Sequence, residues 1–115
     1  MQKITSITEQ PKQKLFVRLK NGNNITLYLE YVASQIGWFL SFEYDGYVSN
    51  SHRITNCYNI IRECQNTVPF GIACTVEDGQ EPYFLDDFKE GRAGLYILSK
   101  NEVAYVEKTY YGKVF

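Results

Sequence analysis

The sequence has little alanine, a single histidine, and one methionine, which stands at its first position. Alanine favours helices, whereas the tyrosine, phenylalanine, threonine, isoleucine and valine that are present suit β-strands. No apolar run approaches the ~18 residues that a transmembrane helix needs, and residues 1–9 contain no apolar signal core. We therefore expect a β-rich protein that stays in the compartment where it is made or leaves it within an assembly.

An excess of positive charge is also absent. The net charge is −1, which disfavours a dedicated duplex-DNA-binding protein. The charges are uneven, because residues 1–20 hold five cations and one anion, whereas residues 77–90 hold six anions and one cation. This distribution predicts either two solvated faces or complementary patches that steer assembly. The length of 115 residues predicts one β domain over residues 1–115.

Cysteine and histidine are too few and too irregularly spaced for a recognisable metal site. The three cysteines are an odd number without a secretion signal, which indicates reduced thiols. Cys57, Cys64 and Cys74 match no zinc knuckle or ribbon, so we expect no metal and no cofactor. His52 and Cys57 could form a catalytic pair, but no activating third residue is apparent. We interpret them as a surface histidine beside a partly buried thiol.

Carboxylates supply two further candidate sets. Glu43 and Asp45 share a face of a predicted strand and could serve glycoside hydrolysis. Five other acidic residues could bind Ca²⁺: Glu77, Asp78, Glu81, Asp86 and Asp87. No loop has the position pattern of a calcium-binding hand, so we interpret both sets as solvated carboxylates near turns. A small hydrolase that uses Glu43, Asp45, Asp86 and Asp87 is the rival to a non-enzymatic protein.

Alternation of apolar and polar residues predicts most of the secondary structure. The clearest element is a hairpin of residues 14–20 with 25–32 around an Asn-Gly turn. Short helical turns are expected near 57–64 and 84–88. Further strands are expected at 37–44, 47–50, 70–76 and 95–98, with a final hairpin in which 103–110 pairs back across a turn at 99–102. Seven or eight short strands with one short helix are typical of a small antiparallel β-sandwich or barrel.

Aromatic residues make up 16% of the chain, more than one small core must absorb. Surplus rings could stack single-stranded nucleic acid on an OB-like barrel or anchor a protein interface. The acidic balance favours the protein interface and leaves nucleic-acid binding as the alternative. Trp38 shares a strand face with Leu40 and Phe42 and is expected in the core. Our candidates for exposed interface anchors are Phe39, Tyr47, Tyr83, Tyr110 and Tyr111.

Four pieces of the sequence occur in a recognisable order. They are Ile25–Leu29 with Gly37–Phe42 and the turn Asp45-Gly46, then Ile60-Ile61, then Phe70–Ile72, and finally Pro82–Phe88 with Leu95-Tyr96. In this order they resemble the small plug proteins of contractile-tailed phage baseplates, a family named from a cyanophage. The resemblance covers about residues 14–99.

The resemblance implies a non-enzymatic structural component of a virion. Such a protein would be a plug or hub-associated protein at the distal end of the tail tube, made in the cytoplasm of the bacterial host. Its implied partners are hub, spike or tube proteins and further copies of itself, with no membrane partner. We expect the segments 1–12 and 101–115 to act as arms that become ordered on assembly.

Overall fold

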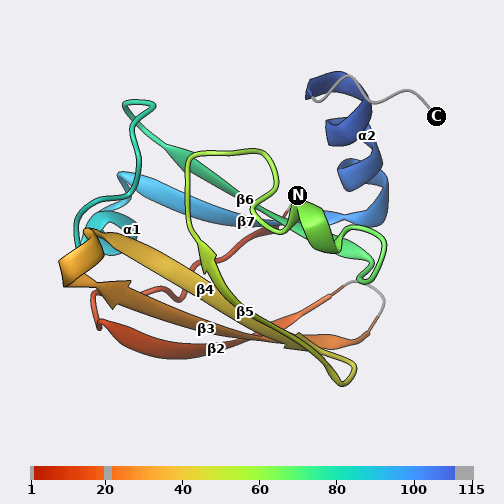
Figure 1. Ribbon diagram of the computed structural model, residues 1–115, viewed down its shortest axis with the longest axis horizontal. Coiled ribbons are helices and arrows are strands. Elements are labelled where there is room, and N and C mark those ends of the chain that lie inside the picture. The colour runs from red at the N-terminus through yellow and green to blue at the C-terminus, as the bar shows by residue number, and fades with distance from the viewer. Residues whose placement is uncertain (1, 20–21, 111–115) are drawn as a thin grey trace.

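In the computed structural model, which describes residues 2–19 and 22–110, two antiparallel β-sheets pack face to face (Figure 1). One sheet has the order β2 (Lys12–Arg18), β3 (Asn24–Val32), β4 (Gly37–Tyr44) and β5 (Tyr47–Arg53). The other has the order β1 (Gln2–Lys3), β7 (Ala93–Ser99) and β6 (Phe70–Val76). The predicted all-β fold is confirmed, and the two separate sheets make it a sandwich.

The β2–β3 hairpin follows the sequence prediction. Leu15 pairs with Leu27 and Val17 with Ile25, so the apolar side chains of both strands share the inner face. Gly22 in the connecting turn has φ of +90°, a conformation that glycine adopts without the steric penalty of a Cβ. Residues 20–21 of the predicted hairpin lie outside the described residues.

The core lies between the two sheets. Trp38 and Phe42 of β4 are fully buried, and the Phe42 ring meets Phe70 of β6 edge-on at a centroid distance of 5.5 Å. Ile4 and Ile7, close to the N-terminus, also belong to this core. The predicted core position of Trp38 is confirmed, and an N-terminal segment that we expected to be an arm contributes buried side chains.

The C-terminal segment differs from the prediction of a final hairpin. Residues Lys100–Tyr110 form helix α2, so the strand expected at 103–110 is wrong. The Ser99 hydroxyl accepts a hydrogen bond from the Glu102 N–H at 3.2 Å, and the Glu102 carboxylate accepts one from the Ser99 N–H at 3.0 Å. This reciprocal pair is a capping box, which starts a helix. The residues interpreted as a hairpin turn are therefore the N-terminal cap of α2.

Helix α2 covers the outer face of the three-stranded sheet. Val103 and Val106 pack on Ala73 of β6 and Leu98 of β7, and in Figure 1 the helix stands above one end of that sheet. The described parts of both predicted arm segments are thus packed, since β1 pairs with β7 and α2 lies on β6 and β7, whereas residues 1 and 111–115 of those segments lie outside the described residues. They could serve as arms only by leaving these contacts.

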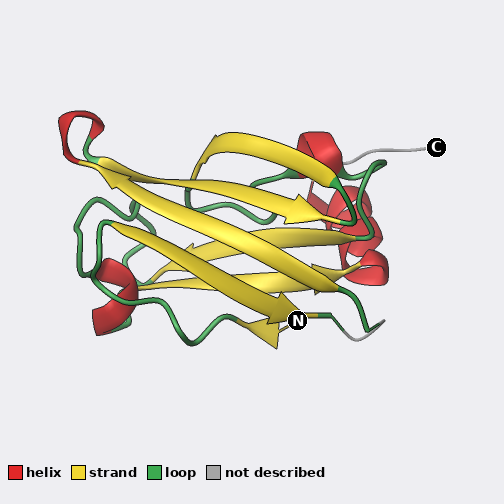
Figure 2. Ribbon diagram, turned by 90° about the horizontal axis from the view of Figure 1, so that it is seen from below, coloured by secondary structure: helices red, strands yellow, loops and turns green. Residues whose placement is uncertain are grey.

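The remaining helical turns lie at the ends of the strands. They are the 3₁₀ turns η1 (Ala33–Gln35) and η2 (Arg62–Cys64) and the short helix α1 (Asp87–Glu90). Figure 2 shows helices at the two ends of the strands and none across the face of the four-stranded sheet that is turned to the viewer. Within the described residues, no helix is long and apolar enough to span a membrane.

Candidate functional site

The structure places four of the five predicted interface anchors on different parts of the surface. Phe39 is half-buried on the outer face of β4, and Tyr47 is partly exposed at the start of β5. Tyr83 is exposed near α1, and Tyr110 lies on α2, stacked on Tyr58 at a centroid distance of 3.8 Å. Tyr111 lies outside the described residues. The structure does not bring these anchors together into one patch.

The outer face of the four-stranded sheet combines aromatic rings with cations. Phe16 on β2 is 71% exposed, and Tyr28 lies beside it on β3. The Lys14 ammonium is 5.3 Å from the Phe16 ring centroid and 5.6 Å from that of Tyr28, within the range of a cation–π contact. The Arg53 guanidinium is 5.4 Å from the Phe39 ring. This open sheet face therefore presents aromatic rings with cationic side chains lying over their faces.

Two carboxylates of the acidic segment 77–90 accept hydrogen bonds from one arginine. Arg92 donates to Asp87 at 2.7 Å and to Asp78 at 3.1 Å. Asp87 is buried and also accepts the Phe84 N–H at 2.8 Å. Our interpretation of Asp87 as a solvated carboxylate is wrong, because the folded loop encloses it against a cation. Glu43 and Asp45 stay solvent-exposed at the β4–β5 turn, as expected.

Within the described residues, one ion pair joins the two oppositely charged segments. Glu9 is the single anion of residues 1–20, and Lys89 is the single cation of residues 77–90. The Lys89 ammonium lies 3.2 Å from the Glu9 carboxylate. Both side chains are about half exposed, so this ion pair contributes little to stability.

A β-bulge in β5 brings two polar side chains onto the same side of the sheet. Ser49 pairs with Phe42 and His52 pairs with Leu40, and the register shifts between these two pairs. In a regular strand, residues three apart point to opposite faces. Here both lie opposite inward-facing residues of β4, because Ser51 adopts a left-handed φ of 59° and absorbs the extra residue. The bulge thereby turns Ser49 and His52 toward the same side of the sheet.

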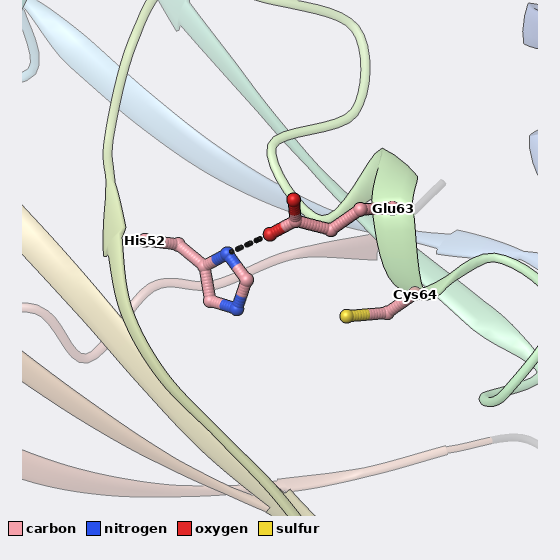
Figure 3. Close-up of side chains that lie close together, drawn as sticks. All are labelled: His52, Glu63 and Cys64. Atoms are coloured by element: carbon pink, nitrogen blue, oxygen red, sulfur yellow. Dashed lines mark ion pairs between the residues drawn. The ribbon is translucent and has the colours of Figure 1, made fainter.

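The His52 side chain faces the 3₁₀ turn η2. Its Nδ1 atom is 3.0 Å from the Glu63 carboxylate, and its Nε2 atom is 2.6 Å from the Ser49 hydroxyl. Figure 3 shows Glu63 and Cys64 projecting from η2 toward the same ring. The Cys64 sulfur is 3.7 Å from the Ser49 hydroxyl and 3.8 Å from the Tyr47 hydroxyl, and contact with this thiol raises the pKa of Tyr47. We call His52, Glu63 and Cys64 the His–Glu–Cys cluster.

This geometry corrects the sequence interpretation of His52. The side chain is buried, with its ring stacked on Phe42 at 6.0 Å, so it is not a surface histidine. Its hydrogen-bonding partners are Ser49 and Glu63. Cys57 instead lies beside Cys74 of β6, where the backbones of the two residues pair and the Cys74 N–H donates to the Cys57 carbonyl oxygen at 3.0 Å. The three cysteines are free thiols. Sequence reasoning missed the grouping of His52 with Glu63 and Cys64, for which no spacing signal exists.

The hydrogen bonds Glu63–His52–Ser49 also have the connectivity of an acid–base–nucleophile triad. Acyl transfer further needs donors aimed at a developing oxyanion beside the serine. The Ser49 hydroxyl also contacts the Cys64 thiol, which in turn contacts the Tyr47 hydroxyl.

The His–Glu–Cys cluster also combines imidazole, carboxylate and thiol, the three side-chain types that bind transition metals.

Comparison with known proteins identifies the fold's relatives. The family model of cyanophage baseplate Pam3 plug gp18 matches residues 1–100, a span that contains both sheets, the open sheet face and the His–Glu–Cys cluster, and that ends at the first residue of α2. None of the curated proteins compared with the chain matches it. A match over that much of the 115 residues shows the family: the chain belongs to the cyanophage baseplate Pam3 plug gp18 family.

Proposed function

We propose that this protein is a structural, non-enzymatic plug at the distal end of a phage tail tube. It would bind hub, spike or tube proteins, and further copies of itself, within the tail baseplate of the virion. Its family supports a structural role in the baseplate. The observation that supports assembly through protein contacts is a set of exposed aromatic rings on several sides of the sandwich, among them Phe16, Tyr83 and Tyr105.

Rings on several sides suit a subunit with more than one neighbour. A stable protein contact covers about 800 Å² per partner and draws most of its affinity from a few aromatic anchors. The open sheet face offers Phe16, Tyr28 and Phe39, and the opposite side of the sandwich offers Tyr105 and Tyr110 on α2. A plug that touches a tube wall on one side and another subunit on the other would use both.

Deletion and complementation of the gene in its phage test this proposal. Without the gene, we expect particles with defective tails and a loss of infectious titre of several orders of magnitude. Intact tails and normal titre in the deletion would contradict an essential baseplate role.

The open sheet face is tested with variants supplied from a plasmid during infection. Tyr28→Glu places a charge among the rings and should lower incorporation of the protein into particles, whereas Tyr28→Phe keeps the ring and should not. Phe39→Ala, Tyr47→Ala, Tyr83→Ala and Tyr110→Ala extend the test to the other predicted anchors. Equal incorporation of Tyr28→Glu and Tyr28→Phe would show that this face is not a contact surface.

Binding of single-stranded nucleic acid is the second candidate, and the same open face favours it. Lys12, Lys14, Arg18 and Arg53 are interspersed with Phe16 and Tyr28 on this face, an arrangement that suits stacking of bases beside phosphates. Fluorescence anisotropy with a labelled oligonucleotide would show affinity that falls steeply with salt. Absence of binding at low salt removes this candidate.

A further inference from the structure

We propose that the His–Glu–Cys cluster binds one transition-metal dication of the zinc class. The site lies between β5 and η2, on the inner side of the four-stranded sheet, and among the described anchors Tyr47 touches it, with its hydroxyl 3.8 Å from the Cys64 sulfur. The proposal does not depend on a baseplate role, because it concerns a ligand bound by the isolated chain.

The donor atoms carry the proposal. One atom each from His52, Glu63 and Cys64 lie within 4.8 Å of one another. From the usual bond lengths of zinc, two donors on one tetrahedral ion are ~3.3 to ~3.6 Å apart. The His52–Glu63 pair, at 3.0 Å, is already within a few tenths of an ångström of this spacing. A shift of about 1 Å brings the thiol to the same spacing.

The surroundings favour metal binding over a chance meeting of side chains. His52 and Cys64 are buried, so a cation there would have two of its protein ligands shielded from water. The Glu63 side chain is 73% exposed and provides the route by which an ion enters. The Ser49 hydroxyl, 2.6 Å from His52 Nε2, orients the ring through the nitrogen that does not face Glu63, as partners of metal-binding histidines commonly do.

Metal binding would move the imidazole proton of His52 and release the thiol proton of Cys64. In the neutral tautomer that has its proton on Nδ1, metal-free His52 donates a hydrogen bond to the Glu63 carboxylate 3.0 Å away. In the metal-bound form Nδ1 and the Glu63 carboxylate both bind the ion, and the imidazole proton resides on Nε2, which donates to Ser49. Cys64 binds as a thiolate and releases its proton to water, so one proton is released per ion.

The site would connect a long loop to the sheet. Residues 54–69 join β5 to β6 without a strand of their own and contain η2. A metal held by His52 on β5 and by two residues of η2 would fix this loop against the four-stranded sheet. Thermal unfolding should therefore move to a higher temperature when the ion is present.

Cobalt titration of the purified, metal-free full-length chain tests the proposal. Co²⁺ bound to a thiolate gives a near-ultraviolet charge-transfer band that a site without sulfur lacks. We expect one Co²⁺ per chain, displaced by Zn²⁺. Glu63→Gln should weaken binding 10-fold or more, and because Glu63 is exposed this variant should keep its fold. Cys64→Ser should abolish the charge-transfer band, and Cys57→Ser is the matched control that should retain it.

Three results would overturn the proposal. The first is an absence of Co²⁺ or Zn²⁺ binding below millimolar concentrations. The second is a charge-transfer band that survives in Cys64→Ser or disappears in Cys57→Ser, which would place the metal at another thiol. The third is covalent labelling of Ser49 by a fluorophosphonate probe in a chain that binds no Co²⁺, which would identify the Glu63–His52–Ser49 contacts as a nucleophilic triad.

Discussion

Glu107 offers a quantitative test of how helix α2 is held on the domain. Its carboxylate is 3% exposed and accepts hydrogen bonds from Arg62 Nε at 3.0 and 2.7 Å and from Gln65 at 2.7 Å. These contacts link α2 to η2, which contains Arg62, and to Gln65, the residue that follows η2. Replacing Glu107 with alanine removes all of them and leaves the guanidinium of Arg62 without this carboxylate.

The magnitude follows from the burial of the two partners. Breaking a fully buried ion pair costs about 3–5 kcal/mol. The Arg62 side chain is 41% exposed, so water recovers part of that loss, and we expect about 2–3 kcal/mol. For a chain of 115 residues, 1 kcal/mol corresponds to roughly 4 °C in Tm. Glu107→Ala should therefore lower Tm by roughly 8–12 °C.

Differential scanning calorimetry and limited trypsin digestion check this prediction. Glu107→Ala should unfold earlier and be cleaved faster after Lys100 and Lys108, whereas Glu107→Gln should show a smaller effect because it keeps an acceptor oxygen. Glu43→Ala removes an exposed carboxylate from β4 and should change Tm by no more than about 2 °C. If Glu107→Ala behaves like Glu43→Ala, the reasoning that this carboxylate fixes α2 to the domain is refuted.

Three further predictions concern other parts of the fold. Gly71→Ala would place a Cβ 2.8 Å from Val103 and should destabilise the protein by about 1–3 kcal/mol, measured by urea unfolding; an unchanged midpoint would contradict the close packing of α2. Burial, with a smaller effect from the nearby Cys57, raises the pKa of Cys74 to about 12, so only about one thiol in ten thousand is ionised at pH 8. Iodoacetamide should thus modify the half-buried Cys57 well before Cys74, as peptide mass spectrometry would show, and equal rates would argue against this burial. The Gln80 N–H and then Arg92 lower the pKa of Asp78, so its stabilising effect is complete above pH ~4 and is lost as the pH falls through the lowered value. Asp78→Asn should reduce the acid-induced fall of Tm below pH ~4, and identical pH profiles would contradict this role.

Local patterns determined much of the fold. The alternation of Leu15 and Val17 against Ile25 and Leu27 specified both strands and the register of the β2–β3 hairpin, since one slip would expose every apolar side chain. The signal for α2 was also present, because Ser99 and Glu102 have the spacing of a capping box. It was misinterpreted because the same residue types are common in turns.

The candidate metal site depends on features that no local pattern contains. His52 and Glu63 are eleven positions apart in the sequence, and they meet only because the β5 bulge at Ser51 turns His52 inward and the following loop returns over it. The burial of Asp87 against Arg92 depends likewise on how the loop after β6 closes.

By itself, the sequence determined an all-β fold of short antiparallel strands, the β2–β3 hairpin and the core position of Trp38, because period-two alternation and turn chemistry act between neighbouring residues. Only the tertiary structure decided which aromatic rings stay on the surface, that the C-terminal helix docks on the second sheet, and that an imidazole, a carboxylate and a thiol converge. Those outcomes depend on contacts between distant segments, whose free energies are set when the two sheets pack.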